Sequence, residues 1–193
     1  MPRRSDARPK AIETTAQLLQ RQGFAATGLE EILATSGAPK GSFYFHFPGG
    51  KEELAAEAVA WSGEAVLAAL EHAIARSDSP GDAIRRFATM QAAQLTSSDF
   101  ALGCPVATVA LEMSSRSEPI RKASEAAMRS WIDRLGAVLI ESGVAPGEAE
   151  ELAEWTIASL EGALLLARAR RDEGVVTRVA ARLADVVEAA TRG

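Results

Sequence analysis

The chain has 193 residues, of which 47% are hydrophobic and 24% are charged. This composition is enough for one or two domains with a sizeable core. Its one cysteine, Cys104, excludes an internal disulfide framework, and its apolar runs are far too short to span a membrane. Because the basic start of the chain lacks the apolar segment of a secretory signal, we expect a cytoplasmic protein.

The formal net charge of −5 at first argues against a polyanionic partner, but the charges are unevenly distributed. Residues 1–51 contain seven cations and four anions, a formal charge of +3, so the remainder carries −8. Positive potential at the N-terminal end favours a nucleic acid there. Arg3, Arg4 and Arg8 form a basic arm that could reach phosphates, although short basic termini are also common without such a role.

Helix-forming residues dominate the composition. Ala, Leu, Glu and Arg are abundant, and no strand-type alternation is sustained. The predicted fold class is therefore all-α. The first helix is expected over residues 9–22, with Gly23 as its end.

Two short helices joined by a tight turn are predicted next. Thr27 and Glu30 have the spacing of a capping box at the start of the first of them. Gly37 is placed to end that helix in a left-handed conformation, and Pro39 suits the first turn of the following helix. Helix, glycine-containing turn and helix make the helix-turn-helix pattern, whose second helix enters a DNA major groove.

The second of these helices carries the chemistry. Phe43 and Phe47 lie four residues apart and predict a buried stripe. The other side chains offer polar groups to phosphate oxygens and base edges, next to a glycine that allows close approach. A solvated helix without a partner is the alternative, but it would expose aromatic rings without a reason. The residues in question are Lys40, Gly41, Ser42, Tyr44 and Phe45.

The run GAPKGSFYFHFPGGKEELAAEA resembles the DNA-binding domain of the TetR/AcrR family of bacterial transcriptional regulators. FPGGKEEL and the later GCPVATVALEMS resemble the branch of lincomycin-resistance and flavonoid-responsive repressors. The resemblance implies an N-terminal three-helix DNA-binding domain over 1–50 and a helical ligand-binding and dimerisation domain over 51–193. It implies base contacts by Lys40, Gly41, Ser42 and Phe45, and sugar-phosphate contacts by Thr27, Tyr44, His46 and Lys51.

The C-terminal part is expected to add helices over 51–76, 82–96, 105–113, 117–142, 146–172 and 175–190, making about nine in all. The helix over 146–172 is apolar nearly all round, so it needs two partners. The resemblance implies a homodimer through the last two helices, and a helix fully buried in a monomer is the alternative. A twofold dimer would bind a palindromic operator. The predicted interface residues are Ala158, Gly162, Leu165, Val179 and Leu183.

Trp and Met side chains in the C-terminal part indicate a small apolar or aromatic ligand, although most such positions are ordinary core. Glu161 is expected at the surface or paired with an arginine before it is expected on a ligand. Cys104 is either a buried small hydrophobe or a redox sensor. The candidate pocket residues are Trp61, Met90, Gln94, Cys104, Leu111, Met128, Trp131, Trp155 and Glu161.

No pattern typical of an enzyme is present. The two histidines, His46 and His72, do not form a recognisable metal-binding spacing with Cys104, and we expect no metal and no cofactor. Neither a glycine-rich phosphate loop nor a nucleophile elbow occurs. The sequence therefore predicts a homodimeric repressor that binds a double-stranded DNA operator and is released by a small molecule. A helical protein-interaction module without ligand-controlled DNA binding is the alternative.

Overall fold

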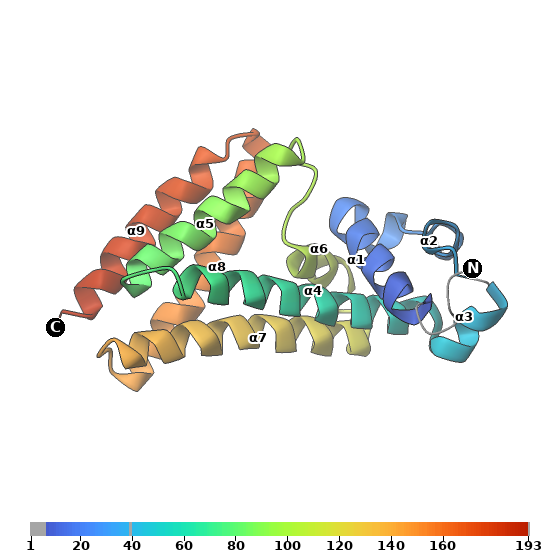
Figure 1. The fold of residues 1–193 in the computed structure, drawn as a ribbon, viewed down its shortest axis with the longest axis horizontal. Coiled ribbons are helices and arrows are strands. Elements are labelled where there is room, and N and C mark those ends of the chain that lie inside the picture. Colours follow the sequence, from blue (N-terminus) through green and yellow to red (C-terminus); the bar gives the residue numbers. More distant parts are fainter. Residues whose placement is uncertain (1–6, 39, 193) are drawn as a thin grey trace. The chain divides into compact units, whose positions relative to one another are not determined.

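A computed structural model describes residues 7–38 and 40–192, except for the side chain of Ser42. Arg3, Arg4 and Pro39 lie outside the described residues. Within that part of the chain the structure has nine helices and no strand, which confirms the all-α prediction (Figure 1). The helices are α1 (Ala7–Ala26), α2 (Leu29–Ser36), α3 (Lys40–His46), α4 (Gly50–Ile74), α5 (Pro80–Ser97), α6 (Pro105–Met113), α7 (Glu118–Glu141), α8 (Pro146–Arg170) and α9 (Gly174–Ala190).

Two glycines end helical segments as the sequence predicts, and a serine moves the start of another helix. Gly23 interrupts α1 with φ 76° and ψ 179°, and Gly37 closes α2 in the left-handed region with φ 68°. Helix α5 begins at Pro80, two residues before the predicted start. The earlier start follows from Ser79, whose hydroxyl accepts a hydrogen bond from the Asp82 backbone N–H at 3.1 Å.

The predicted capping box at Thr27 is wrong. The residue at the N-cap of α2 is Gly28, which has no side chain to accept a hydrogen bond. The Thr27 hydroxyl instead donates to the Gly23 carbonyl oxygen at 2.7 Å, and Thr27 is fully buried. The left-handed turn at Gly23 brings that carbonyl within reach of the hydroxyl, so Thr27 secures the turn before α2 rather than the first turn of α2.

The described chain forms two compact units. The first contains the residues up to Glu64 together with 104–127, and the second contains 65–103 together with 128–193. In the first unit α1 packs against α6 and α2. The unit that holds α2 and α3 therefore includes segments that lie beyond residue 50. The functional boundary at residue 50 stays a prediction.

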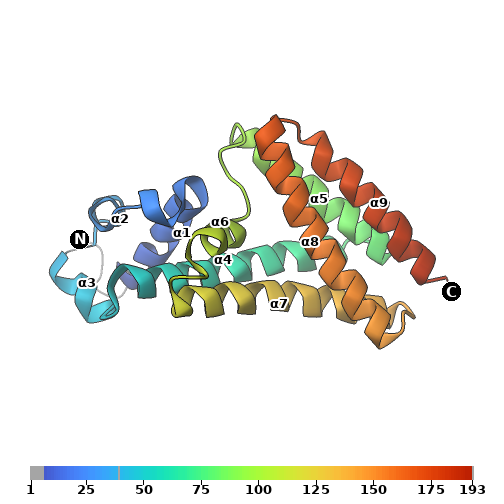
Figure 2. The ribbon, with the colours of Figure 1, turned by 180° about the vertical axis from the view of Figure 1, so that it is seen from behind.

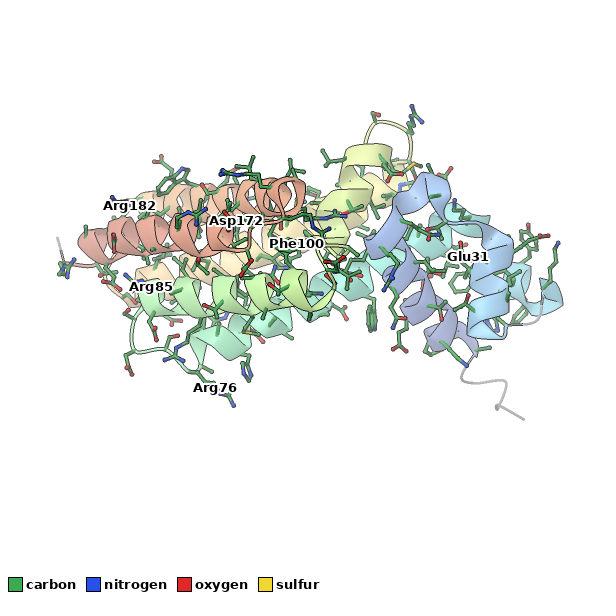
Figure 3. The ribbon with its side chains drawn as sticks, turned by 90° about the horizontal axis from the view of Figure 1, so that it is seen from above. Glu31, Arg76, Arg85, Phe100, Asp172 and Arg182 are labelled. Carbon is green, nitrogen blue, oxygen red and sulfur yellow. The ribbon has the colours of Figure 1, made fainter. Side chains whose placement is uncertain are left out.

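The second unit is built on α5, α8 and α9, which lie side by side (Figure 2). Leu183 of α9 is buried among these helices, as are Ile84 of α5 and Leu164 of α8. Arg85 on α5, which is labelled in Figure 3, forms ion pairs across the surface with Asp185 and Glu188 of α9, at 3.2 and 2.8 Å. Among the described residues no helix is both long and apolar enough to cross a membrane.

Candidate nucleic-acid interface

The turn between α2 and α3 is held by backbone conformation and by one buried hydroxyl. Gly37 supplies the left-handed residue that ends α2. The Ser36 hydroxyl donates to the Leu33 carbonyl oxygen at 3.4 Å and accepts from the Ala38 backbone N–H at 3.3 Å. These bonds satisfy polar groups that the end of α2 leaves open, and they constrain where the chain starts α3.

Aromatic packing anchors α3 to the first unit. Phe43 and Phe47 are buried with their ring centroids 5.4 Å apart, which confirms the predicted stripe. The Tyr44 ring meets the Phe43 ring edge-on at 5.1 Å. A helix of only two turns has little stability of its own, so these contacts hold it in place.

The opposite face of α3 is open. Phe45 is 83% exposed and Tyr44 is 57% exposed, beside exposed Lys40 and Gly41. A Cβ added to Gly41 would meet no other part of the described chain within 4 Å. Glycine weakens a helix, and nothing in the described fold requires it here. Gly41 and the exposed rings therefore leave this face of α3 accessible to a partner.

Lys40 is available to such a partner. Its ammonium lies 3.3 Å from Glu30 Oε1, and both side chains are largely exposed to solvent. An exposed ion pair of this kind contributes less than about 1 kcal/mol, so the lysine can exchange it for a phosphate or a base edge.

Other predicted contact residues are placed differently. His46 is half-buried and meets the Phe45 and Phe47 rings edge-on, at 5.3 and 6.4 Å. Thr27 has no exposed surface to offer a phosphate, which removes it from the predicted interface. The Lys51 ammonium donates to the Phe24 carbonyl oxygen at 2.7 Å, so it is engaged within the chain. The structure does not describe the side chain of Ser42.

One member of the predicted basic arm is also engaged within the chain. Arg8 donates to both carboxylate oxygens of Glu57, at 2.7 and 2.6 Å, and its guanidinium lies 5.4 Å from the Phe47 ring centroid. These contacts join α1 to α4 and cover the aromatic anchor of α3. Arg8 thus stabilises the buried side of α3 rather than extending toward a partner.

The predicted pocket residues are divided between the two units. Trp61, Cys104 and Leu111 belong to the first unit, and the other six belong to the second. Leu111 is 82% exposed and faces outward. Buried Cys104 caps α6, where its sulfur accepts from the Ala107 backbone N–H at 3.4 Å, as a structural residue would.

Within the second unit the candidates separate by burial. Trp131 of α7 is buried, and Met128 and Glu161 are half-buried. Met90 and Gln94 are exposed on α5. No group of three or more His, Cys, Asp or Glu side chains in the described chain is placed to hold a metal ion.

The outward face of α8 carries a continuous apolar stripe. Leu165 is 61% exposed, and Trp155, one of the predicted pocket residues, lies on the same stripe and is 46% exposed. Sequence reasoning missed Trp155 and Leu166 as interface candidates because a helix that is apolar all round does not show which face is outward. We call this the outer stripe; its residues are Trp155, Ala158, Gly162, Leu165 and Leu166.

Helix α9 adds less to this surface than its sequence predicts. Val179 is half-buried and Val186 is exposed, but Leu183 is only 1% exposed. The inclusion of Leu183 in the predicted interface is therefore wrong. The apolar stripe of α9 packs against α5 and α8 within its own unit, and the Leu183 side chain is part of that core.

Comparisons with known proteins agree with this arrangement. Residues 11–58 match the family model of bacterial regulatory proteins of the tetR family, and residues 80–182 match the C-terminal domain model of LmrA/YxaF-like transcriptional regulators. The HTH-type transcriptional regulator YxaF of Bacillus subtilis is 36% identical over 95% of this chain and 96% of its own length. LmrA of the same organism is 32% identical over 95% of this chain and 97% of its own length.

Solved structures show the same fold. The regulatory protein TetR from Rhodobacter sphaeroides superimposes with a TM-score of 0.82 at 22% identity, over 93% of this chain and 98% of that one. The matched models cover both the helix-turn-helix and the helices that follow it. The chain therefore belongs to the TetR family of DNA-binding transcriptional regulators, with an LmrA/YxaF-like C-terminal domain, and is not an enzyme.

Proposed function

We propose that this regulator is a homodimeric repressor that binds a palindromic operator through α3 and is released by a small apolar or aromatic ligand. The observation that carries the proposal is the open face of α3, where exposed Tyr44 and Phe45 stand beside Lys40 and a glycine that the fold does not require. A protein that only occupies DNA blocks transcription, so repression is the default outcome. Such a regulator acts in the cytoplasm, where bacterial DNA lies.

The chemistry of α3 suggests how an operator is read. The Phe45 ring has no hydrogen-bonding group, so the base-edge feature it suits in the major groove is the C5-methyl group of thymine. Lys40 can donate to guanine acceptors or to phosphate, and the Tyr44 hydroxyl suits a phosphate oxygen. Gly41 lets the helix backbone approach the groove closely. We therefore expect at least one thymine in each half-site opposite Phe45.

The outer stripe of α8 supports dimerisation. Its apolar side chains recur at helical spacing over about 16 Å of the helix, from Trp155 to Leu166. Gly162 lies at its centre, and a Cβ added there would meet no other part of the described chain within 4 Å. Because no contact within the described chain requires a glycine here, and exposed Leu165 and Leu166 lie on the same stripe, Gly162 suits the close approach of another helix. A second copy of the same stripe is self-complementary about a twofold axis, and that axis would make the operator a palindrome.

A buried hydroxyl supports ligand binding in the second unit. Thr156 on the inner face of α8 is fully buried, and its Oγ1 finds no hydrogen-bond partner among the described residues. An unsatisfied buried hydroxyl costs about 1–3 kcal/mol, and a ligand with an acceptor group would remove that cost. Trp131 and Met128 on α7 supply apolar surface in the same unit. We expect a planar ligand with an oxygen acceptor.

The experiment is capture of genomic fragments by the purified protein, followed by sequencing and operator titration. We expect enrichment of a palindrome with thymine in each half, and weaker binding by Tyr44→Ala with the fold preserved. That loss should be similar for all operator variants because a phosphate contact carries no sequence information. An aromatic ligand can be identified by its effect on Trp fluorescence. Operator DNA should lower the affinity for this ligand by the same factor by which the ligand lowers the affinity for operator DNA. Capture without any sequence preference would contradict the proposal.

A further inference from the structure

Residues 23–27, which follow the kink at Gly23 in α1 and precede α2, are held by side chains from distant parts of the chain; we call this segment the turn before α2. The Ala25 backbone N–H donates to Glu112 Oε2 of α6 at 2.9 Å. The Phe24 carbonyl oxygen accepts from Lys51 Nζ of α4 at 2.7 Å. Two adjacent residues of one turn are thus bound by a carboxylate and an ammonium, which lie 87 and 27 residues away in sequence.

Gly23 makes room for the carboxylate. A Cβ added to Gly23 would overlap Glu112 Oε1, and the φ of 76° is itself unfavourable for a residue with a side chain. The Gly23 carbonyl oxygen meanwhile accepts the Thr27 hydroxyl at 2.7 Å. Glycine at position 23 therefore allows the positive φ of the turn and also leaves space for the Glu112 carboxylate.

Lys51 and Glu112 act on the turn together. The Lys51 ammonium lies 3.9 Å from the centroid of the Phe24 ring, in cation–π contact. Burial lowers the pKa of Lys51 below its usual value, and the charge of Glu112 partly opposes that shift. The two charges compensate each other beside the turn, and each also satisfies a backbone group of it.

We propose that Glu112 and Lys51 form a clamp that positions α2 and α3 for DNA binding. In this arrangement neither residue needs to touch DNA. The clamp fixes the backbone at Phe24 and Ala25, and Ala25 lies four residues before the start of α2 at Leu29. Helix α2 in turn leads into α3 through the Gly37 turn. Lys51 therefore acts as a positioning residue, whereas the family resemblance implies a phosphate contact for it.

The sign of the effect of Glu112 on DNA affinity tests the clamp. Removal of a carboxylate from a DNA-binding unit reduces repulsion and by charge alone strengthens binding or leaves it unchanged. The clamp instead requires that Glu112→Ala weaken operator binding, by about tenfold or more, because the bond of Ala25 to a charged acceptor is lost. Glu125→Ala, which removes an exposed carboxylate of α7 in the same unit, is the matched control and should not weaken binding.

Two further variants separate positioning from phosphate contact. Glu112→Gln keeps an oxygen acceptor for Ala25 and should retain most of the affinity. Lys51→Met keeps an apolar stem against Phe24 but loses the donor and the charge. As a clamp residue, Lys51 should leave the salt dependence of binding unchanged when it is replaced, whereas loss of a phosphate contact would make the slope shallower by about one unit.

Amide hydrogen exchange provides a readout that does not depend on DNA. Such a readout is needed because the affinity measurements on these variants rest on the proposed operator binding. The Ala25 amide should be protected in the wild-type protein and in Glu125→Ala, and should exchange much faster in Glu112→Ala. Unchanged exchange at Ala25 in Glu112→Ala, or operator binding by that variant as tight as wild type, would overturn the clamp. A wild-type protein that binds no operator would instead contradict the proposed function, and the exchange data would still decide the clamp.

Discussion

Helices α3 and α8 both expose apolar side chains around a glycine for which the described fold gives no reason, but their surroundings differ. On α3 the exposed rings of Tyr44 and Phe45 stand beside a lysine. On α8 the outer stripe is aliphatic and aromatic with small residues and no cation within it. A mixed polar and aromatic face suits the edges and phosphates of a groove, whereas a purely apolar face suits another protein helix. We therefore propose different partners for the two exposed surfaces, DNA for α3 and a second copy of the chain for α8.

The largest effect is expected from a charge placed in the outer stripe. Gly162→Arg puts a cation at the centre of the proposed contact, where desolvation without a partner would separate the dimer. Sedimentation should show a monomer, and operator affinity should fall by at least about 100-fold because the second α3 would no longer bind at high effective concentration. Gly147→Arg is the matched control, since Gly147 lies near the start of the same helix with nothing within 4 Å of an added Cβ in the described chain. A folded Gly162→Arg dimer would place the interface elsewhere.

A smaller effect is expected at Phe45, and it tests the apolar contact on α3. Phe45→Ala should weaken operator binding by about tenfold, the cost of one base contact. Operators with deoxyuridine in place of single thymines lack only the methyl group. The wild-type protein should bind one such operator more weakly at one position per half-site, and Phe45→Ala should not distinguish it from the thymine form. Equal discrimination by both proteins would show that Phe45 does not read a methyl group.

Replacing each glycine by alanine compares the two faces directly. Gly41→Ala and Gly162→Ala should each raise the intrinsic stability of the helix by about 0.5–1 kcal/mol, because alanine loses less conformational freedom on folding. Thermal unfolding of the free protein would measure that gain for Gly41→Ala. Operator binding should nevertheless weaken severalfold for Gly41→Ala, and the dimer should dissociate more readily for Gly162→Ala. Unchanged operator affinity of Gly41→Ala and unchanged dimer affinity of Gly162→Ala would show that neither glycine is needed for the close approach of a partner.

The smallest effect concerns the inner face of α8. Thr156→Val removes a buried hydroxyl without a partner among the described residues, so the free energy of unfolding should rise by about 1 kcal/mol. The same variant should bind the ligand more weakly. Thr89→Val on α5 is the control, because Thr89 is exposed and its hydroxyl already donates to the Arg85 carbonyl oxygen at 2.8 Å. A less stable Thr156→Val would show that the hydroxyl is satisfied in solution.

The sequence alone determined the parts of this protein that depend on local chemistry. Gly23 and Gly37 marked helix ends because a left-handed backbone favours glycine, and Phe43 and Phe47 marked the buried side of α3 because residues four apart share a helix face. The start of α5 was displaced by two residues, from Asp82 to Pro80, because Ser79 caps the helix. The helix-turn-helix and its family followed from such short-range patterns.

The tertiary structure alone decided which groups were left for partners. Thr27 has the right spacing for a cap, yet its hydroxyl bonds to Gly23, and Leu183 has the right periodicity for an interface, yet it fills the core. Lys51 has the sequence position of a phosphate contact, yet its ammonium donates to the Phe24 carbonyl oxygen within the chain. The physical reason is the same in each case: a side chain binds the nearest suitable group in space, and that group can lie on a helix distant in sequence, where neither spacing nor periodicity records it.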